Sequence, residues 1–165
     1  MLAPAVVHKE EICRLIAMHV YDSEYQYVNI RSWHTFDPEF YVPVDDWGKL
    51  SLVSVDSHGK LGYICASIDR DLDEVDGLTI ANYGCDKTEF GKDLILCFKL
   101  LQQRFRAIRW TVVIGNPVEP MYDKFCQRMG GRIVGIKMQA CRLANGSYAD
   151  VKQYEWIKNV SCGSP

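Results

Sequence analysis

The sequence predicts an α/β fold in a single domain spanning residues 1–165, with a mixed sheet that has helices on both faces. Its 165 residues are 48% hydrophobic, which is enough for a sizeable core in one domain. Apolar residues at helical spacing alternate along the chain with short runs of β-branched and aromatic residues. No internal repeat or linker interrupts this alternation, so the order of elements indicates one sheet covered on both sides.

The N-terminal part is predicted to hold a short strand followed by helices. Residues 2–7 could form the strand, and residues 8–20 form an amphipathic helix with acidic residues at its positive end. Segment 21–47 is rich in tyrosine and tryptophan and could contain a further helix over residues 22–33. So much aromatic surface beside a loop forms either a substrate wall or a lid packed on the core.

The middle of the chain is predicted to contribute three strands. Residues 50–55 and 61–68 form two of them, joined by a hairpin turn at residues 56–59. The acidic stretch 69–77 is expected to be a solvated loop. The third strand covers residues 78–85.

A helix and a strand follow. The helix is expected over residues 89–105, and its buried face would carry five apolar side chains: Leu94, Ile95, Phe98, Leu101 and Phe105. Residues 108–114 are β-branched or aromatic apart from one arginine, as expected of a buried strand. Gly115-Asn116-Pro117 ends that strand, because proline removes a donor and Gly-Asn tolerates unusual backbone angles.

The C-terminal part is predicted to be one helix and a hairpin. Met121, Phe125 and Met129 share a stripe of the helix, with Tyr122 and Cys126 beside it. Gly130-Gly131 closes the helix. Strands over residues 132–143 and 148–160 flank a strong turn signal at residues 144–147.

Composition narrows the range of partners and the compartment. The formal charge is −2, from 19 basic and 21 acidic residues without a basic block, so nucleic acid is not expected as a main partner. No apolar run has the length of a membrane span, and residues 1–8 lack the basic region and the apolar core expected of a signal peptide. The seven cysteines are scattered without a Cys-x-x-Cys pair, which favours buried, reduced thiols in a cytoplasmic protein and no metal site.

One stretch of the chain resembles a known family. Asn116, Tyr122-Asp123-Lys124 and the Gly130-Gly131 pair are similar to the Asn-…-Tyr-x-Lys-…-Gly-Phe pattern of the GCN5-related N-acetyltransferases (GNAT), although Arg132 stands in place of the phenylalanine. The resemblance covers about Gly77 to Ile157. It implies a mixed, mostly antiparallel twisted sheet, acetyl-coenzyme A as acyl donor, and an amine as acceptor.

The same resemblance suggests where the acyl donor binds. A helix N-terminus is a prepared anion site, and the turn at residues 86–93 would receive the pyrophosphate of coenzyme A. The family motif there is Gln/Arg-x-x-Gly-x-Gly/Ala. With Gly91 in register, Thr88 and Asp93 depart from it, and Asp86 and Glu89 could equally form a plain helix cap. The candidate donor-binding residues are Tyr83, Cys85, Lys87, Thr88, Gly91, Lys92 and Asn116.

Tyr122 is the candidate catalytic residue. In the family a tyrosine at this place protonates the departing thiolate, which has a pKa of about 8.5 and needs only modest help from a phenol. Alternatively, Tyr122 packs on the sheet with its hydroxyl bonded locally. Asn116 would hold the pantetheine arm, or only form the turn. The backbone of residues 82–84 would polarise the acetyl carbonyl.

The base that deprotonates the amine is not singled out by spacing. Five residues remain candidates for it: His34, Glu39, Asp69, Asp71 and Asp150.

The resemblance implies an N-acetyltransferase in which the amine of a small molecule or peptide attacks the thioester directly in a ternary complex. A degenerate, non-catalytic binding or regulatory module, using segment 21–47 as its contact surface, is the alternative from another class. A third possibility is a Cys–His enzyme with Cys85 as its nucleophile. It is not supported, because no histidine has a spacing that points to such a pair. A homodimer through the final hairpin is compatible with either of the first two functions.

Overall fold

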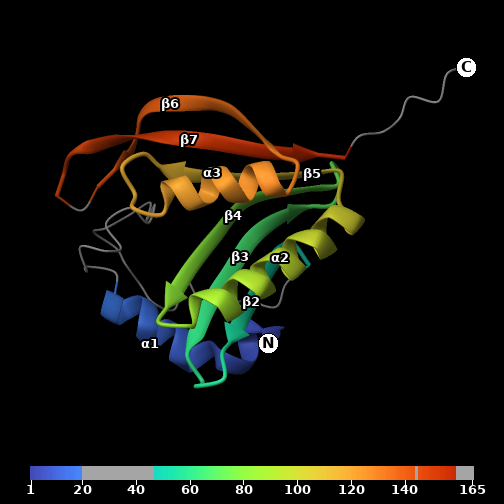
Figure 1. The fold of residues 1–165 in the computed structure, drawn as a ribbon, viewed down its shortest axis with the longest axis vertical. Coiled ribbons are helices and arrows are strands. Elements are labelled where there is room, and N and C mark those ends of the chain that lie inside the picture. Colours follow the sequence, from blue (N-terminus) through green and yellow to red (C-terminus); the bar gives the residue numbers. More distant parts are fainter. Residues whose placement is uncertain (20–46, 144, 159–165) are drawn as a thin grey trace, which may run out of the picture.

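The structure is a computed structural model that describes residues 1–19, 47–143 and 145–158. These residues form a seven-stranded sheet in the order β1-β2-β3-β4-β5-β7-β6 (Figure 1). The strands are β1 (Leu2–Pro4), β2 (Lys49–Val55), β3 (Leu61–Asp69), β4 (Glu74–Tyr83), β5 (Ala107–Val113), β6 (Arg132–Arg142) and β7 (Tyr148–Ile157). The helices are the 3₁₀-helix η1 (Ala5–His8), α1 (Lys9–His19), α2 (Lys87–Arg104) and α3 (Glu119–Arg128).

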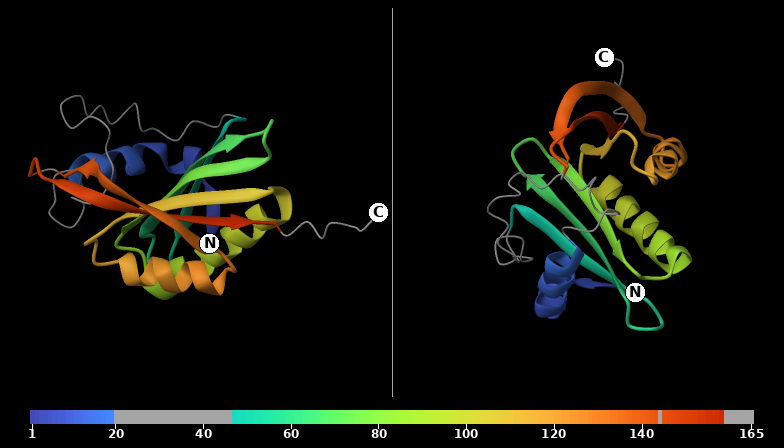
Figure 2. Two further views of the ribbon diagram at one scale, coloured as in Figure 1. Left: turned by 90° about the horizontal axis from the view of Figure 1, so that it is seen from above. Right: turned by 90° about the vertical axis from the view of Figure 1, so that its left-hand side faces the viewer.

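Helices cover both faces of this sheet, as the sequence predicted. Figure 2 shows α1 on one face and α2 with α3 on the other. Neighbouring described strands pair antiparallel, except that β4 and β5 pair in parallel across the α2 connection. The mixed, mostly antiparallel α/β fold class is therefore confirmed.

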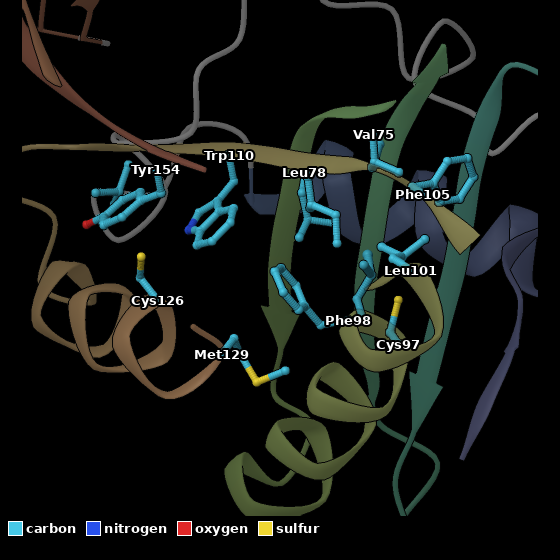
Figure 3. Packing of buried hydrophobic residues seen from close by; sticks show 14 of the residues in the cluster. Val75, Leu78, Cys97, Phe98, Leu101, Phe105, Trp110, Cys126, Met129 and Tyr154 are labelled. Carbon is cyan, nitrogen blue, oxygen red and sulfur yellow. The ribbon is translucent and has the colours of Figure 1, made fainter. Parts of the chain in front are cut away.

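The larger core lies between the sheet and helices α2 and α3. Phe90, Cys97, Phe98 and Leu101 are the buried residues of α2, and their spacing places them on one side of the helix. Phe98 meets Trp110 of β5 edge to face, with ring centroids 5.4 Å apart (Figure 3). Such aromatic pairs stabilise beyond the area that they bury, so this contact fixes α2 on the sheet.

Helix α3 follows the predicted stripe except at its start. Met121 is 61% exposed, whereas Cys126 and Met129 are buried. Phe125 and Met129 pack in the larger core as predicted, together with Tyr122 and Cys126, so only Met121 departs from the predicted stripe. Gly131 follows, and a Cβ there would lie 3.0 Å from the Sγ of Cys126, so only glycine allows this close return to the sheet.

Two predicted element boundaries were wrong. The first strand ends at Pro4 and continues as a 3₁₀-helix, since proline cannot donate to the ladder. Strand β4 begins at Glu74, inside the stretch expected to be a solvated loop. Glu74 is 7% exposed and forms ion pairs with Arg106 and Arg109, whose charges offset the cost of its burial.

The other boundaries agree with the sequence to within a few residues. Helix α2 starts at Lys87 and not at Glu89, and β7 ends at Ile157 within the predicted range. The predicted helix over residues 22–33 and almost all of the aromatic segment lie outside the described residues.

Candidate functional site

The candidate site lies where β4 and β5 separate. Their parallel register ends with Leu78 opposite Trp110. Beyond that point β4 continues beside β3, and β5 continues beside β7 (Figure 1). Helices α2 and α3 both begin just after these separated strand ends, so backbone groups at two helix N-termini face the same region.

Asn116 shapes the turn that leads from β5 into α3. Its side-chain Oδ1 accepts a hydrogen bond from the backbone N–H of Val118 at 3.1 Å, and its carbonyl accepts from Glu119 N–H at 2.8 Å. The turn-forming role is therefore present in the structure. Within the described part of the chain the Asn116 amide N–H₂ has no recorded bond, so a ligand could still use it as a donor.

Tyr122 lies in the first half of α3 and packs against the larger core. Burial of the ring raises the pKa of Tyr122 to about 12, so the phenol keeps its proton at neutral pH. Among the described residues no group is recorded as a hydrogen-bond partner of this hydroxyl. The structure therefore does not show the local hydrogen bond that is expected if Tyr122 only packs on the sheet.

A polar cluster fixes α3 against β7. The ammonium of Lys152 lies 2.5 Å from the Oε1 of Glu119 and 3.0 Å from the Oδ2 of Asp123, and Tyr154 donates to Asp123 at 2.7 Å. The bond to Lys152 lowers the pKa of Glu119, and the bond from Tyr154 lowers the pKa of Asp123. The orientation of Tyr122 therefore depends on charged neighbours on both sides of it in α3.

The N-terminus of α2 is capped by a side chain of the protein itself. Asp86 is the N-cap residue, and its Oδ1 accepts hydrogen bonds at 2.9 Å from the backbone N–H groups of Thr88 and Glu89. The first bond within the helix runs from Phe90 N–H to the Asp86 carbonyl. A helix start leaves few amides without an internal partner, and Asp86 occupies two of them here.

Further carboxylates hold the β2–β3 hairpin against this helix start. Asp56 accepts from the N–H groups of His58, Lys60 and Asp86, each at 2.8 Å. Burial would raise the pKa of Asp56, but these three bonds outweigh it and leave that pKa lowered. Glu89 accepts at 3.0 Å from both the N–H and the hydroxyl of Ser57.

The predicted donor-binding residues fit coenzyme A only in part. Lys87 and Lys92 are exposed at the start of α2 and supply positive charge. A Cβ on Gly91 would meet no atom within 4 Å, so neither packing nor its backbone angle requires glycine there. The Thr88 amide, however, is bonded to Asp86. The pyrophosphate part therefore fits poorly in this form of the helix start.

Cys85 does not have the environment of a nucleophile. The residue is 3% exposed, and burial raises the pKa of its thiol, so the reactive thiolate is disfavoured. Its side chain packs in the larger core, which leaves only its backbone for a donor. These observations oppose the Cys–His enzyme.

Tyr83, a predicted donor-binding residue, meets His19, which the sequence analysis did not single out. The ring of His19, the last residue of α1, stacks on the ring of Tyr83 at 5.7 Å with an interplanar angle of 24°. Tyr83 is the last residue of β4 and packs on the α1 face. No local pattern predicts this contact, because the two residues are far apart in sequence.

The candidate bases lie apart from one another. Asp69 caps the β3–β4 turn by accepting from the N–H groups of Asp71 and Leu72, at the far end of β4 from Tyr83. Asp150 lies in β7 between β5 and β6: its carbonyl accepts from Ile114 N–H at 2.8 Å, and its Oδ1 accepts from Gln139 N–H at 2.8 Å. His34 and Glu39 lie outside the described residues. Of the described candidates, Asp150 alone lies beside the end of β5, and Asp69 and Asp71 do not.

Comparison by sequence finds no relative: no family model and no curated protein matches the chain. Among the described residues, no helix combines the length and the apolar character needed to cross a membrane.

Comparison by structure finds proteins with a similar fold. A spermidine N-acetyltransferase from Vibrio cholerae, solved with CoA and spermine, is 16% identical and superposes with a TM-score of 0.70 over 95% of this chain and 94% of that one. A GCN5-related N-acetyltransferase from Kribbella flavida gives 16% identity, a TM-score of 0.68, and coverage of 96% and 97%.

A probable GNAT-family acetyltransferase from Chromobacterium violaceum gives 15% identity, a TM-score of 0.66, and coverage of 95% and 81%. The three similar structures share one architecture with this chain over nearly its full length. The chain therefore has the fold of the GCN5-related N-acetyltransferases.

Proposed function

We propose that the chain is an N-acyltransferase that transfers an acetyl group from acetyl-coenzyme A to an amine of a small molecule or peptide. The observation that carries the proposal is Tyr122 in α3, the helix that follows β5: its ring packs on the larger core, and among the described residues its hydroxyl has no hydrogen-bond partner. The fold that this chain shares with solved acetyltransferases supports the same reaction class.

In this reaction the lone pair of the amine attacks the thioester carbon directly. Backbone N–H groups at residues 82–84, at the end of β4, would stabilise the charge that develops on the carbonyl oxygen. As the carbon–sulfur bond breaks, Tyr122 donates its proton to the leaving thiolate and regains one from solvent. The attacking amine loses its proton to a base that the described residues do not identify.

A non-catalytic module with the same fold remains the second candidate, and one observation favours it. The carboxylate of Asp86 occupies the helix amides that a pyrophosphate would need. In a protein that does not bind coenzyme A, these amides are not needed for a pyrophosphate, so the cap has no functional cost.

Thermal melting with and without acetyl-coenzyme A distinguishes the two candidates. Ligand at a hundredfold excess over its Kd stabilises the folded protein by about 2.7 kcal/mol, which moves Tm by several degrees. We expect a shift that Gly91→Glu weakens, because the variant adds negative charge at an open position of α2. Gly91→Ala is the matched control and should keep the shift. A lack of any shift at millimolar ligand would favour the non-catalytic module.

The acceptor can then be sought among amines. Polyamines come first in the screen, because one similar structure is a spermidine N-acetyltransferase solved with spermine. Peptides with a free amino group follow, and release of the coenzyme A thiol reports turnover. We also infer a cytoplasmic location, because the buried cysteines Cys85, Cys97, Cys126 and Cys141 are free thiols.

A further inference from the structure

We propose that Lys152 of β7 is a positioning residue that fixes the orientation of α3 and, with it, the place of the Tyr122 hydroxyl. It acts through two carboxylates of α3, those of Glu119 and Asp123. This inference rests on the proposed acyltransferase function, since it concerns the proton donor of that reaction. The ammonium of Lys152 is bonded to both carboxylates, so we assign it no contact with either substrate.

The Tyr122 hydroxyl has no hydrogen-bond partner among the described residues, so its place depends on how α3 lies on the sheet. The ring itself packs in the larger core. One turn further along the helix, Phe125 contacts Phe98 and Trp110 edge to face. Apolar contacts are largely non-directional, so they hold α3 against the sheet more firmly than they fix its rotation about its own axis.

The directional contacts of α3 converge on Lys152 and its neighbour Tyr154. In the described part of the chain, each recorded polar bond between an α3 side chain and the sheet involves Glu119 or Asp123. The Lys152 ammonium lies 2.5 Å from the Oε1 of Glu119 and 3.1 and 3.0 Å from the two oxygens of Asp123. Lys152 and Tyr154 are alternate residues of β7, so they point to the same face and hold the same helix.

Loss of the cation would disturb the part of α3 that carries Tyr122. Glu119 and Asp123 are one helical turn apart and share a face, and like charges at this spacing repel each other. Their pKa values are lowered, so both are charged at neutral pH and need the cation between them. The Oε2 of Glu119 also accepts from Gly115 N–H at 3.1 Å, so the same ion pair holds the turn before α3. Tyr122 lies between the two carboxylates and would move with them.

A double-mutant cycle on the full chain tests this role. Release of the coenzyme A thiol from acetyl-coenzyme A is followed with a polyamine as acceptor and, separately, with water alone. We expect Lys152→Met to lower kcat about tenfold, within the range that a misplaced catalytic group causes. Lys152→Arg keeps the cation and should recover most of this loss. In a Tyr122→Phe background, Lys152→Met should leave kcat nearly unchanged, because the group that Lys152 positions is already absent.

Arg132→Met is the matched control. It removes a cation from another ion pair of β7, in which Arg132 lies 2.6 Å from Glu155. Residues 152 and 155 are an odd number of positions apart, so their side chains point to opposite faces of the sheet. Arg132→Met should therefore keep the kcat of the original chain even where its Tm falls. All rates are measured well below the lowest Tm of the set, and Lys152→Gln replaces Lys152→Met in the cycle if the latter does not fold.

The outcomes separate the inference from the proposed function. Full kcat in the folded Lys152 variants would refute the role of Lys152 and leave the acyltransferase function standing. An equal loss in both backgrounds, or an equal loss in Arg132→Met, would show that Lys152 supports only the general stability of the protein and would also overturn the inference. If the original chain releases no thiol with either acceptor, the proposed function fails, and the inference fails with it.

Discussion

At the scale of single residues, the proposed chemistry depends on the hydroxyl of Tyr122. Phenylalanine at this position keeps the buried ring and removes only the proton donor. We expect Tyr122→Phe to lower kcat about 100-fold, as is typical of losing a general acid, with little change in Tm or in the Kd for coenzyme A. Steady-state kinetics with thiol detection measures the rates. Tyr148→Phe, on an exposed tyrosine of β7, should leave kcat unchanged.

The pH dependence of kcat gives a second test of Tyr122 as the proton donor. Because burial raises the pKa of Tyr122 to about 12, the phenol is protonated at every pH in the usual working range. An alkaline decline of kcat that comes from Tyr122 should therefore begin only above about pH 11. If an alkaline decline near pH 9 disappears in Tyr122→Phe, the phenol ionises far more easily than its burial implies.

At the scale of elements, the contact between α3 and β7 decides where Tyr122 points. Lys152 is 13% exposed and lies between two carboxylates of α3, Glu119 and Asp123. Lys152→Met would leave these carboxylates facing each other without a cation. We expect it to lower the free energy of unfolding by about 1–2 kcal/mol, less than for a fully buried pair, because Asp123 is 40% exposed. Urea unfolding measures the difference.

The pH range of this stabilisation follows from the pKa directions. The folded-state pKa values of Glu119 and Asp123 are lowered, so their contribution is present above about pH 4–5 and is lost as the pH falls. The pKa of Lys152 is raised by its bond to Glu119, so its contribution is lost only above about pH 10. The difference between the original chain and Lys152→Met should be largest between these limits. Lys152→Arg should recover most of it, and a pH-independent difference would contradict this account.

The elements also show how far local sequence patterns reach. Helix α2 and strand β5 were predicted nearly in full, because periodic burial and a following turn are encoded within each segment. The start of β4 was missed, because Glu74 is neutralised by arginines more than thirty residues away. In the same way, only the folded chain shows that Met121 faces outward and Tyr122 inward.

Prediction of the site was limited in the same way, because local patterns are visible in the sequence and contacts between distant segments are not. The resemblance to the acetyltransferase pattern suggested Asn116, Tyr122 and the turn before α2, and it left open whether Asp86 was a helix cap. The structure resolves that question in favour of the cap. The separation of β4 from β5 and the stacking of His19 on Tyr83 depend on the packing of distant segments, so no local pattern contains them.

At the scale of the whole molecule, strand β6 is the most open edge of the described sheet. It pairs on one side with β7 and, among the described strands, has no neighbour on its other side. Four of its apolar side chains are exposed: Ile133, Val134, Ile136 and Met138. Monomeric proteins usually protect such an edge with charge or with a covering element.

We propose that a second copy of the chain covers β6, as expected for a homodimer formed through the final hairpin. Two copies related by a twofold axis can pair the same strand with itself, and the exposed apolar side chains on both faces of β6 would become buried. Sedimentation velocity should show a dimer whose fraction rises with protein concentration.

The combined change Val134→Lys and Met138→Lys should yield a monomer, because it places four additional charges in the dimer interface. Val7→Lys, which alters an exposed apolar residue of η1 on a different element, should remain a dimer. Acetyl transfer by the monomeric variant would show that each site is complete within one chain. If the original chain sediments as a monomer at every concentration, β6 is not a self-association surface.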